Sequence, residues 1–334
     1  MNLDNLEKIF SGKPTFQLRQ AKEAVFKHLI DDWTQATSLP RDLRETLNKE
    51  CPLDINAQLF TSDDKNTIKA LIALEDGLKI ETVLMRYQNG RNTICVSSQV
   101  GCPLNCLFCA TGKTGFKRDL TVEEIIEQVL LFARLLKKDS QRVDNVVFMG
   151  MGEPFLNYDN VMAAIKILND QKQGMSIGAR HISVSTVGVP GGIKKFADEP
   201  LQINLAISLH APNNELRIKI VPANKKYPIE KILKDVADYL KKTGRKIMFE
   251  YIMIKGLNDS PTDAEELARL LNGSLPKPFM VNLISYNPTG IFESSTQENI
   301  KRFKDALTKQ HIEVTQRYKF GSQIRAACGQ LAVK

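Results

Sequence analysis

The 334-residue chain is 43% apolar and 25% charged, and it carries a formal net charge of +8 at neutral pH. This composition excludes a disordered chain, and no apolar run reaches the roughly 18 residues of a membrane span. The positive charge suits a polyanion such as a nucleic acid, but it is spread over many small clusters, so an ordinary solvated surface explains it equally well.

The first 93 residues contain two kinds of pattern. Residues 15–50 place apolar side chains such as Ala21 and Val25 at helical spacing, which predicts short helices in a helical, RNA-binding-like module over residues 1–52. Residues 53–93 alternate apolar and polar side chains between glycine turns and predict a strand-rich connecting region. The opening residues lack the apolar core of a signal peptide, so we expect a protein of the reducing cytoplasm.

Strand and helix patterns alternate in order between residues 94 and 310. Six such units predict an α/β fold whose parallel sheet is wound into a partial (β/α)6 TIM-like barrel, followed by a carboxyl-terminal tail over residues 311–334. Functional side chains of such barrels come from the carboxyl ends of the strands. The predicted strands are residues 94–99, 144–149, 180–185, 203–208, 246–254 and 279–285. The predicted helices are residues 121–137, 158–169, a short one near 192, 228–242, 262–272 and 296–310.

Three cysteines, Cys102, Cys106 and Cys109, follow the first barrel strand with CxxxCxxC spacing. A [4Fe-4S] cluster takes four thiolates when it only carries electrons, so three ligands leave one iron free to bind another molecule, such as S-adenosylmethionine. A structural zinc is the alternative, but it needs a fourth ligand and usually a second pair of cysteines or histidines. No such pair is present, and the spacing therefore favours the cluster of a radical enzyme.

Polar and glycine residues end the following strands. Gly152 and Glu153, in GMGEP, let backbone approach a ligand closely and offer a carboxylate to an ammonium group. Residues of these types also serve as caps and turns, but their recurrence at successive strand ends around one mouth predicts a pocket. The further residues at these strand ends are Ser185, Thr186, Ser208, Leu209, His210 and Asn287.

Two isolated cysteines complete the candidate site. Cys95 lies on the strand that leads into the clustered cysteines, and Cys328 lies close to the end of the chain. Either one, taken alone, suits a small buried apolar side chain. Two extra thiols that can meet at one barrel mouth instead suggest thiol chemistry.

These motifs together are similar to the RlmN/Cfr family of radical SAM dual-specificity RNA methyltransferases, and most similar to its RlmN type, which methylates adenine carbon 2. The similarity covers nearly the whole chain. The segments that carry it are CVSSQVGC (95–102), CATGKTGFKRDLT (109–121), GMGEP (150–154), STVG (185–188), SLHAP (208–212), VPANKKYPI (221–229), NLISYNP (282–288) and AACGQL (326–331).

The resemblance implies a role for each candidate residue. The three clustered cysteines would hold a [4Fe-4S] cluster, and two molecules of S-adenosylmethionine would be used in each turnover. Cys328 would be the cysteine that becomes methylated, Cys95 would resolve it by forming a disulfide, and Glu81 would accept a proton. The implied S-adenosylmethionine contacts are Gly152, Glu153, Ser185, Ser208, Leu209, His210 and Asn287.

A cysteine carrier answers a chemical problem. An adenine ring carbon is electrophilic and cannot attack a sulfonium methyl group directly. In the mechanism that the resemblance implies, Cys328 is methylated first by ordinary displacement, its methyl group then loses hydrogen to an adenosyl radical, and the new carbon radical adds to the ring. Loss of a proton and attack by Cys95 release the product.

The identity of the product stays open between related outcomes. The proline of GMGEP favours methylation at carbon 2 of an adenosine in 23S rRNA, whereas RYKFGS (317–322) resembles the type that methylates carbon 8 and confers resistance. Gln323 and Arg325 replace the usual acidic residues beside Cys328, so a non-catalytic RNA-binding relative is a third hypothesis. The resemblance further implies adenosine 37 of tRNA as a second substrate, flavodoxin as electron donor, a monomer and no membrane association.

Overall fold

The computed structural model describes residues 1–318 and 320–333. Its helices are α1 (Leu3–Ile9), α2 (Thr15–Phe26), η1 (Trp33–Gln35), α3 (Arg41–Glu50), α4 (Ala110–Lys113), α5 (Val122–Lys138), α6 (Tyr158–Asn169), η2 (Ala179–His181), α7 (Gly192–Ala197), α8 (Asn214–Ile220), η3 (Pro222–Lys225), α9 (Ile229–Thr243), α10 (Pro261–Ser274) and α11 (Gln297–Lys309). Its strands are β1 (Ala57–Thr61), β2 (Thr67–Ala73), β3 (Lys79–Arg86), β4 (Asn92–Cys95), β5 (Gln99–Gly101), β6 (Phe116–Asp119), β7 (Asn145–Phe148), β8 (Ile182–Thr186), β9 (Asn204–Ser208), β10 (Ile247–Met253), β11 (Phe279–Ser285) and β12 (Glu313–Gln316).

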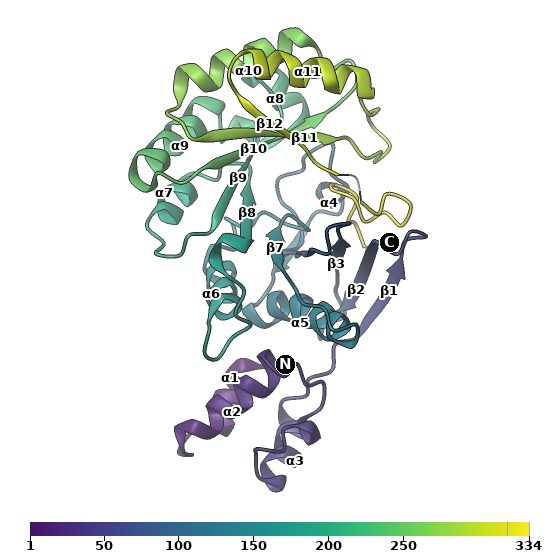
Figure 1. Cartoon of the computed structure of the whole chain (residues 1–334), viewed down its shortest axis with the longest axis vertical. Coiled ribbons are helices and arrows are strands. Elements are labelled where there is room, and N and C mark those ends of the chain that lie inside the picture. The colour runs from purple at the N-terminus through teal and green to yellow at the C-terminus, as the bar shows by residue number, and fades with distance from the viewer. Residues whose placement is uncertain (319, 334) are drawn as a thin grey trace.

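One ten-stranded sheet organises the molecule in the order β1-β2-β3-β4-β7-β8-β9-β10-β11-β12. Neighbouring strands from β4 to β12 are parallel, and β1, β2 and β3 extend the sheet as an antiparallel meander beside β4. In Figure 1 the strand direction turns from nearly vertical at β7 to nearly horizontal at β11, as in an open barrel. The predicted α/β class and its six parallel strands are confirmed.

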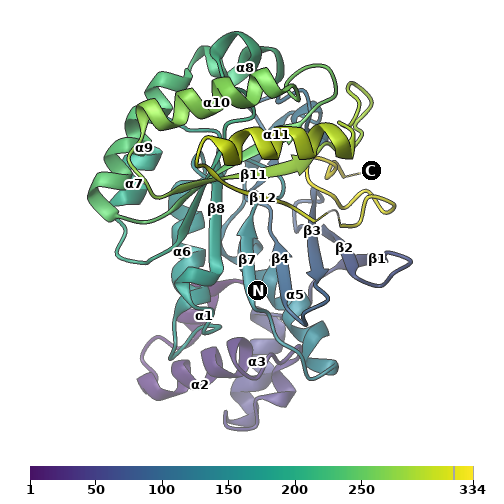
Figure 2. The ribbon, with the colours of Figure 1, turned by 45° about the horizontal axis from the view of Figure 1, so that its top comes forward.

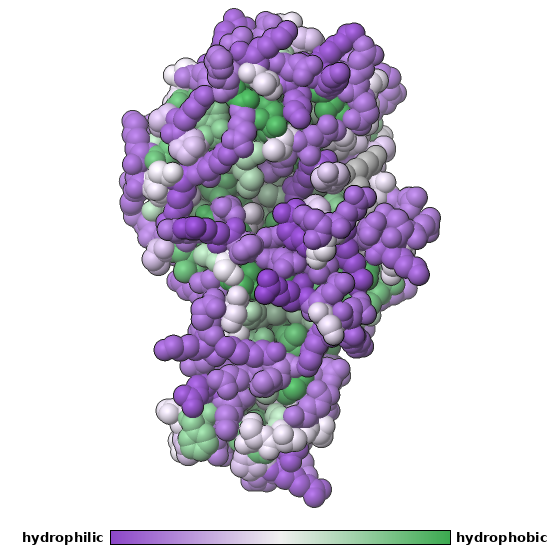
Figure 3. All heavy atoms as spheres, viewed as in Figure 1, coloured by the Kyte–Doolittle hydropathy of each residue, from purple (hydrophilic) through white to green (hydrophobic). Residues whose placement is uncertain are grey.

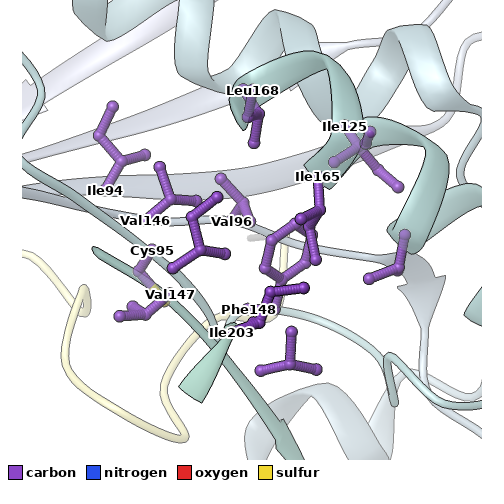
Figure 4. Close-up of a cluster of buried hydrophobic side chains, with 14 of the residues drawn as sticks. Ile94, Cys95, Val96, Ile125, Val146, Val147, Phe148, Ile165, Leu168 and Ile203 are labelled. Carbon is purple, nitrogen blue, oxygen red and sulfur yellow. The ribbon is translucent and has the colours of Figure 1, made fainter. Parts of the chain in front are cut away.

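Helices cover the outer face of this sheet because each presents one apolar stripe to it. The N-cap of α5 is Thr121, whose side chain forms a capping box with Glu124. Figure 2 shows α7, α9, α10 and α11 following one another around the outside of the barrel. Figure 4 shows the apolar layer between the first parallel strands and the helices that follow them, formed by Ile94, Val96, Ile125, Val146, Phe148, Ile165 and Leu168.

Strand alternation turns other side chains the opposite way, toward the barrel interior. Cys95 is the last residue of β4, between Ile94 and Val96 in the chain, and its register partner on β7 is Val147. Figure 4 shows these two side chains next to each other at one side of the buried cluster. Cys95 therefore belongs to the interior face on which a barrel places its functional groups.

The amino-terminal helices α1 to α3 pack below α5 (Figure 1). Trp33 is fully buried among them, and its ring nitrogen donates to the carbonyl oxygen of Cys51 at 2.7 Å. Arg134 of α5 joins this group of helices to the barrel by donating to the carbonyl oxygens of Ile30 and Leu53 at 2.6 and 2.9 Å. The domain boundaries predicted at residues 52, 93 and 310 stay predictions. β1, β2 and β3 belong to the same sheet as the barrel strands, so the sheet does not separate the connecting region from the barrel.

Two features of the fold go beyond the sequence prediction. β12 forms within residues 311–334, where only a tail was predicted, and β5 pairs with β6 in a separate two-stranded sheet beside the clustered cysteines. Within the described part of the chain, no helix combines the length and apolar character needed to cross a membrane. The face shown in Figure 3 is largely hydrophilic, with scattered apolar patches.

Candidate active site

A cavity opens at the carboxyl ends of the parallel strands and collects most of the predicted residues. It is lined on one side by the loop after β5, on another by the ends of β7 to β11, and on a third by the carboxyl-terminal tail. The predicted residues that line it are Cys95, Cys102, Cys106, Cys109, Gly152, Glu153, Ser185, Ser208, His210, Asn287 and Cys328. Thr186, Leu209 and Glu81 do not line it.

The loop that carries the clustered cysteines is fixed by two glycines. A Cβ at Gly101 would lie 1.7 Å from the carbonyl oxygen of Gly115, and the φ of Gly101 is +78°. Only glycine therefore fits at this position, where β5 pairs with β6. A Cβ at Gly112 would lie 3.1 Å from the backbone of Cys106. The backbone of the loop is thus packed from both sides, and its three thiols lie along one wall of the cavity.

The three thiols fit an iron–sulfur cluster in their chemistry. All are free, and each lies on the same cavity. Among the residues that the structure describes, no three histidine, cysteine or carboxylate side chains converge as ligands of a single metal ion do. A cubane makes a different demand, because each thiolate binds its own iron atom and the sulfur atoms stay apart.

Glu153 joins two strand ends. Its carboxylate accepts from the backbone N–H groups of Phe155 and Val187, both at 3.0 Å, and its own N–H donates to the Gln99 side chain at 2.9 Å. Burial raises the pKa of Glu153 to about 7. A Cβ at Gly152 would lie 2.6 Å from the Cβ of Gln99, so glycine is needed here for close packing against Gln99. The sequence analysis predicted a glycine that lets a ligand approach the backbone, and the structure adds this contact within the protein.

The ends of β8, β9 and β11 present neutral polar groups. The hydroxyl groups of Ser185 and Ser208 lie 3.2 Å apart. Burial, reinforced by the nearby Arg217, lowers the pKa of His210 to about 3, and its Nδ1 accepts from the N–H of Ile252 at 3.2 Å. The His210 ring is therefore neutral and carries its proton on Nε2.

Asn287 provides an acceptor with no protein partner. Its Nδ2 donates to the carbonyl oxygen of Cys328 at 3.1 Å, but its buried Oδ1 has no hydrogen-bond partner in the described part of the chain. An unsatisfied buried amide oxygen is costly unless a ligand supplies a donor. Oδ1 of Asn287 thus fits a ligand with hydroxyl or ammonium groups, as S-adenosylmethionine has.

Arg217 of α8 supports these strand ends, and the sequence analysis missed it. Its fully buried guanidinium donates to the carbonyl oxygens of Leu209 at 2.9 Å, Ser208 at 3.1 Å and Val187 at 2.8 Å. It also donates to the Asn224 side chain at 2.8 Å and to the carbonyl oxygen of Tyr227 at 2.9 Å. Leu209 thus contributes its backbone to a network behind the cavity wall.

Replacing Arg217 with methionine is expected to lower the free energy of unfolding by about 3 kcal/mol or more, because several buried acceptors lose their donor at once. Urea denaturation of the purified variant measures the change. Lys219→Met is the matched control, since Lys219 lies on the same helix but is exposed and forms a surface ion pair with Glu215 at 3.2 Å. The effect of this change on the free energy of unfolding should stay below about 0.5 kcal/mol. Equal decreases in the free energy of unfolding of the two variants would contradict a stabilising role of the Arg217 network.

The carboxyl-terminal tail brings Cys328 to the cavity by backbone contacts on both sides. The N–H of Ala110, next to Cys109, donates to the carbonyl oxygen of Gly329 at 2.7 Å. The Thr111 hydroxyl donates to the carbonyl oxygen of Leu331 at 2.6 Å. With the bond from Asn287, these contacts hold the tail between the clustered cysteines and the end of β11.

Cys95 and Cys328 line the same cavity, but they are not bonded to each other. Both are free thiols, so the predicted disulfide is absent from this structure. Burial, and then the proximity of Cys328, raise the pKa of Cys95 to about 12, which keeps this thiol protonated at rest. The partly buried Arg317 also lines the cavity, donates to the Met149 sulfur at 2.9 Å and lies 3.9 Å from the Glu250 carboxylate.

Glu81 lies behind the tail instead of on the cavity wall. Its carboxylate pairs with Lys69 at 2.8 Å, and both side chains are at least nine-tenths buried. The other carboxylate oxygen accepts from the N–H of Ala332 at 2.8 Å. The predicted proton acceptor is therefore covered by the tail in this conformation, and Lys69 is a partner that the sequence analysis missed.

Comparisons with known proteins cover nearly the whole chain. The model of the Radical SAM superfamily matches residues 96–271. A probable dual-specificity RNA methyltransferase RlmN from Dictyoglomus thermophilum is 47% identical over 322 residues, which cover 96% of this chain and 91% of that protein. Ribosomal RNA large subunit methyltransferase N from Nitrosopumilus maritimus is also 47% identical, over 90% of this chain and 87% of that protein. The crystal structure of a radical SAM methyltransferase from Sphaerobacter thermophilus is 43% identical, covers 100% of this chain and 98% of its own, and superposes with a TM-score of 0.94.

Proposed function

Because the chain belongs to the radical SAM superfamily and, within it, to the RlmN-type RNA methyltransferases, we propose that it methylates carbon 2 of an adenosine in the peptidyl-transferase region of 23S rRNA. The observation that carries this proposal is the position of Cys328. The carboxyl-terminal tail around it is hydrogen-bonded to the loop of the clustered cysteines, and Cys328 lines the same cavity as these cysteines. A transferable methyl group on a side chain at this cavity is what an electrophilic ring carbon requires.

The proposed cofactors have their ligands on this cavity. Cys102, Cys106 and Cys109 would hold the [4Fe-4S] cluster, and the strand ends would hold S-adenosylmethionine, with Asn287 and Glu153 offering acceptors to it. When bound, these groups supply a methyl group and, after one-electron cleavage of a second S-adenosylmethionine, a radical that removes hydrogen. The protein contributes the carrier, the orientation and the exclusion of water.

The remaining chemistry falls to side chains of the chain itself. The Cys328 thiolate would take the methyl group by displacement, and its carbon would then form the bond to the adenine ring. Once the ring adduct has given up one electron to the proposed cluster, the Cys95 thiolate would attack the Cys328 sulfur and break its bond to the methylene carbon. That carbon would take up a proton and become the methyl group of the base, which leaves a disulfide that exists only after product release. Glu81 would accept the ring proton, and for this the tail must move, because Ala332 and Lys69 occupy both of its carboxylate oxygens.

Mass spectrometry of nucleosides tests the proposal directly. Deletion of the gene should remove 2-methyladenosine from 23S rRNA, and the wild-type gene should restore it, whereas rRNA that keeps this nucleoside after deletion would overturn the proposal. The same digest tests tRNA adenosine 37 as the second proposed substrate. The proposal includes a cytoplasmic monomer that receives its electron from a donor such as flavodoxin.

Methylation at carbon 8 is the second candidate, and one observation favours it. RYKFGS (317–322) resembles the carbon-8 type, and Arg317, Tyr318 and Phe320 of this segment line the same cavity. The two products differ in chromatographic retention, so one digest separates them. Appearance of 8-methyladenosine on expression, with no 2-methyladenosine, would replace the first candidate by the second. Purified protein whose Cys328 never acquires a methyl group would instead indicate a non-catalytic relative.

A further inference from the structure

Aromatic side chains from two distant parts of the chain meet at the rim of the cavity. Tyr87 follows β3 at the turn to β4, and Tyr318 and Phe320 follow β12 in the segment that leads to Cys328. The Tyr87 ring packs edge-on against Phe320 at 4.7 Å and Tyr318 at 6.4 Å between ring centroids. The guanidinium of Arg91 lies over the Tyr87 ring at 4.5 Å. We call these four residues the rim ledge.

The rim ledge is held in place by the backbone beneath it. The turn that carries Tyr87 and Arg91 is closed by hydrogen bonds from the N–H of Tyr87 to the carbonyl oxygen of Arg91 and from the N–H of Gly90 to that of Tyr87, both at 2.9 Å. On the other side, the N–H of Arg317 donates to the carbonyl oxygen of Leu283 at 2.9 Å, which fixes the chain just before Tyr318. These hydrogen bonds therefore fix the two backbone segments that carry the rings.

Exposure distinguishes Tyr318 from its neighbours. It is 77% exposed, the most of any large apolar side chain that the structure describes, while Tyr87 and Phe320 are partly buried. A single exposed apolar side chain needs no explanation. Tyr318, however, lines the cavity that also holds Cys328, and it stands beside two further rings and a cation. An uncovered ring in this setting is typical of a surface that binds a planar group.

Single-stranded nucleic acids are bound by this combination of groups. Bases stack on exposed aromatic rings, and arginine adds attraction both to the ring faces and to phosphate. A base that must reach Cys328 has to leave its own stack, so the neighbouring base loses a stacking partner. We propose that the rim ledge stacks the nucleobase next to the adenosine whose base enters the cavity, with Tyr318 as the stacking ring. This inference rests on the proposed RNA methyltransferase function and names a contact within it.

A fluorescent RNA tests the stacking separately from catalysis. The probe is a short oligouridine that contains one adenosine, with 2-aminopurine placed on its 5′ side, on its 3′ side, or several positions away. Because 2-aminopurine fluorescence falls when the base stacks, the wild-type protein should quench the probe at one adjacent position and not at the distant one. Tyr318→Ala should lose this quenching and bind the RNA about tenfold more weakly, because the neighbouring base loses the ring on which it stacks.

Two further variants separate stacking from other causes. Tyr318→Phe keeps the ring and removes the hydroxyl group, so quenching and affinity should stay close to wild type. Leu59→Ala removes an apolar side chain of β1 that is 44% exposed and lies outside the cavity lining, and it should change neither. Equal unfolding midpoints for all variants would show that the fold is kept.

Different experimental results would overturn the stacking proposal and the proposed function. Wild-type protein that quenches neither adjacent position, or Tyr318→Ala that quenches as well as wild type, would overturn the ledge even if methyladenosine is formed. Wild-type protein that yields no methyladenosine in any RNA would overturn the proposed function, whatever the quenching result.

Discussion

Replacing Cys328 with alanine is expected to reduce formation of methyladenosine by at least about a thousandfold, a loss typical of removing a covalent nucleophile. The reason is that the ring carbon cannot take a methyl group directly, so no other residue can substitute for the carrier. The tail should still dock, because its contacts with Asn287, Ala110 and Thr111 use backbone carbonyl oxygens of residues 328, 329 and 331. Product nucleosides from reconstituted enzyme and unmethylated rRNA provide the measurement.

Two cysteine variants serve as comparisons for Cys328→Ala. Cys51→Ala removes a buried thiol among the amino-terminal helices and should keep full activity. Cys95→Ala should also lose turnover, but for another reason: RNA should stay covalently attached to Cys328, since the thiol that releases it is absent. A slowly migrating protein–RNA adduct in Cys95→Ala and none in Cys328→Ala is the expected pair of results. Normal methyladenosine from Cys328→Ala would end the carrier mechanism.

The regular elements of the barrel were predictable because their apolar periodicity is strong. The predicted helix over residues 121–137 is α5 (Val122–Lys138), and the predicted strand over residues 279–285 is β11 with the same bounds. The two strands at the edges of the sheet were harder to predict. β12 contains Glu313, Val314, Thr315 and Gln316, whose side chains are all at least partly exposed, so it gives no buried pattern to recognise. β1 likewise contains no fully buried residue.

The site could be predicted only as far as side-chain types reveal it. Cysteine spacing identified the loop at residues 102–109, and strand ends identified Ser185, Ser208 and Asn287, all of which line one cavity. Arg217 gave no comparable signal, because four of its five acceptors are backbone carbonyl oxygens, which every residue has. Its importance follows from burial, and burial of a charged group is decided by tertiary packing.

The pairing of Lys69 with Glu81 could have been found from the sequence. Both lie in the region over residues 53–93 that was predicted to be rich in strands, and Gly77 lies between them. In the resulting hairpin Leu71 is the register partner of Glu81, which puts Lys69 diagonally across from the carboxylate on the same face. The contact of Ala332 with Glu81 joins residues 251 positions apart and could not be found in this way.

Replacing Cys106 with alanine is expected to remove the iron–sulfur cluster and, with it, all activity. Cys106 is the most buried of the three clustered thiols, and its backbone packs against Gly112, so no other side chain can take its place without moving the loop. Two thiolates are too few to hold a cubane that already lacks its fourth protein ligand. After anaerobic reconstitution, iron and sulfide per chain should fall to background, and the broad visible absorption should disappear.

Cys51→Ala is again the matched control, because it also removes a buried cysteine but one that lies outside the cavity lining, and it should keep the iron content of wild type. In wild-type protein, S-adenosylmethionine should alter the electron paramagnetic resonance spectrum of the reduced cluster, since the iron without a cysteine ligand is free to bind it. Cys106→Ala that retains a stoichiometric cluster would contradict the assignment of the clustered cysteines. A wild-type spectrum that S-adenosylmethionine leaves unchanged would contradict the open iron, on which the chemistry proposed for Cys328 depends.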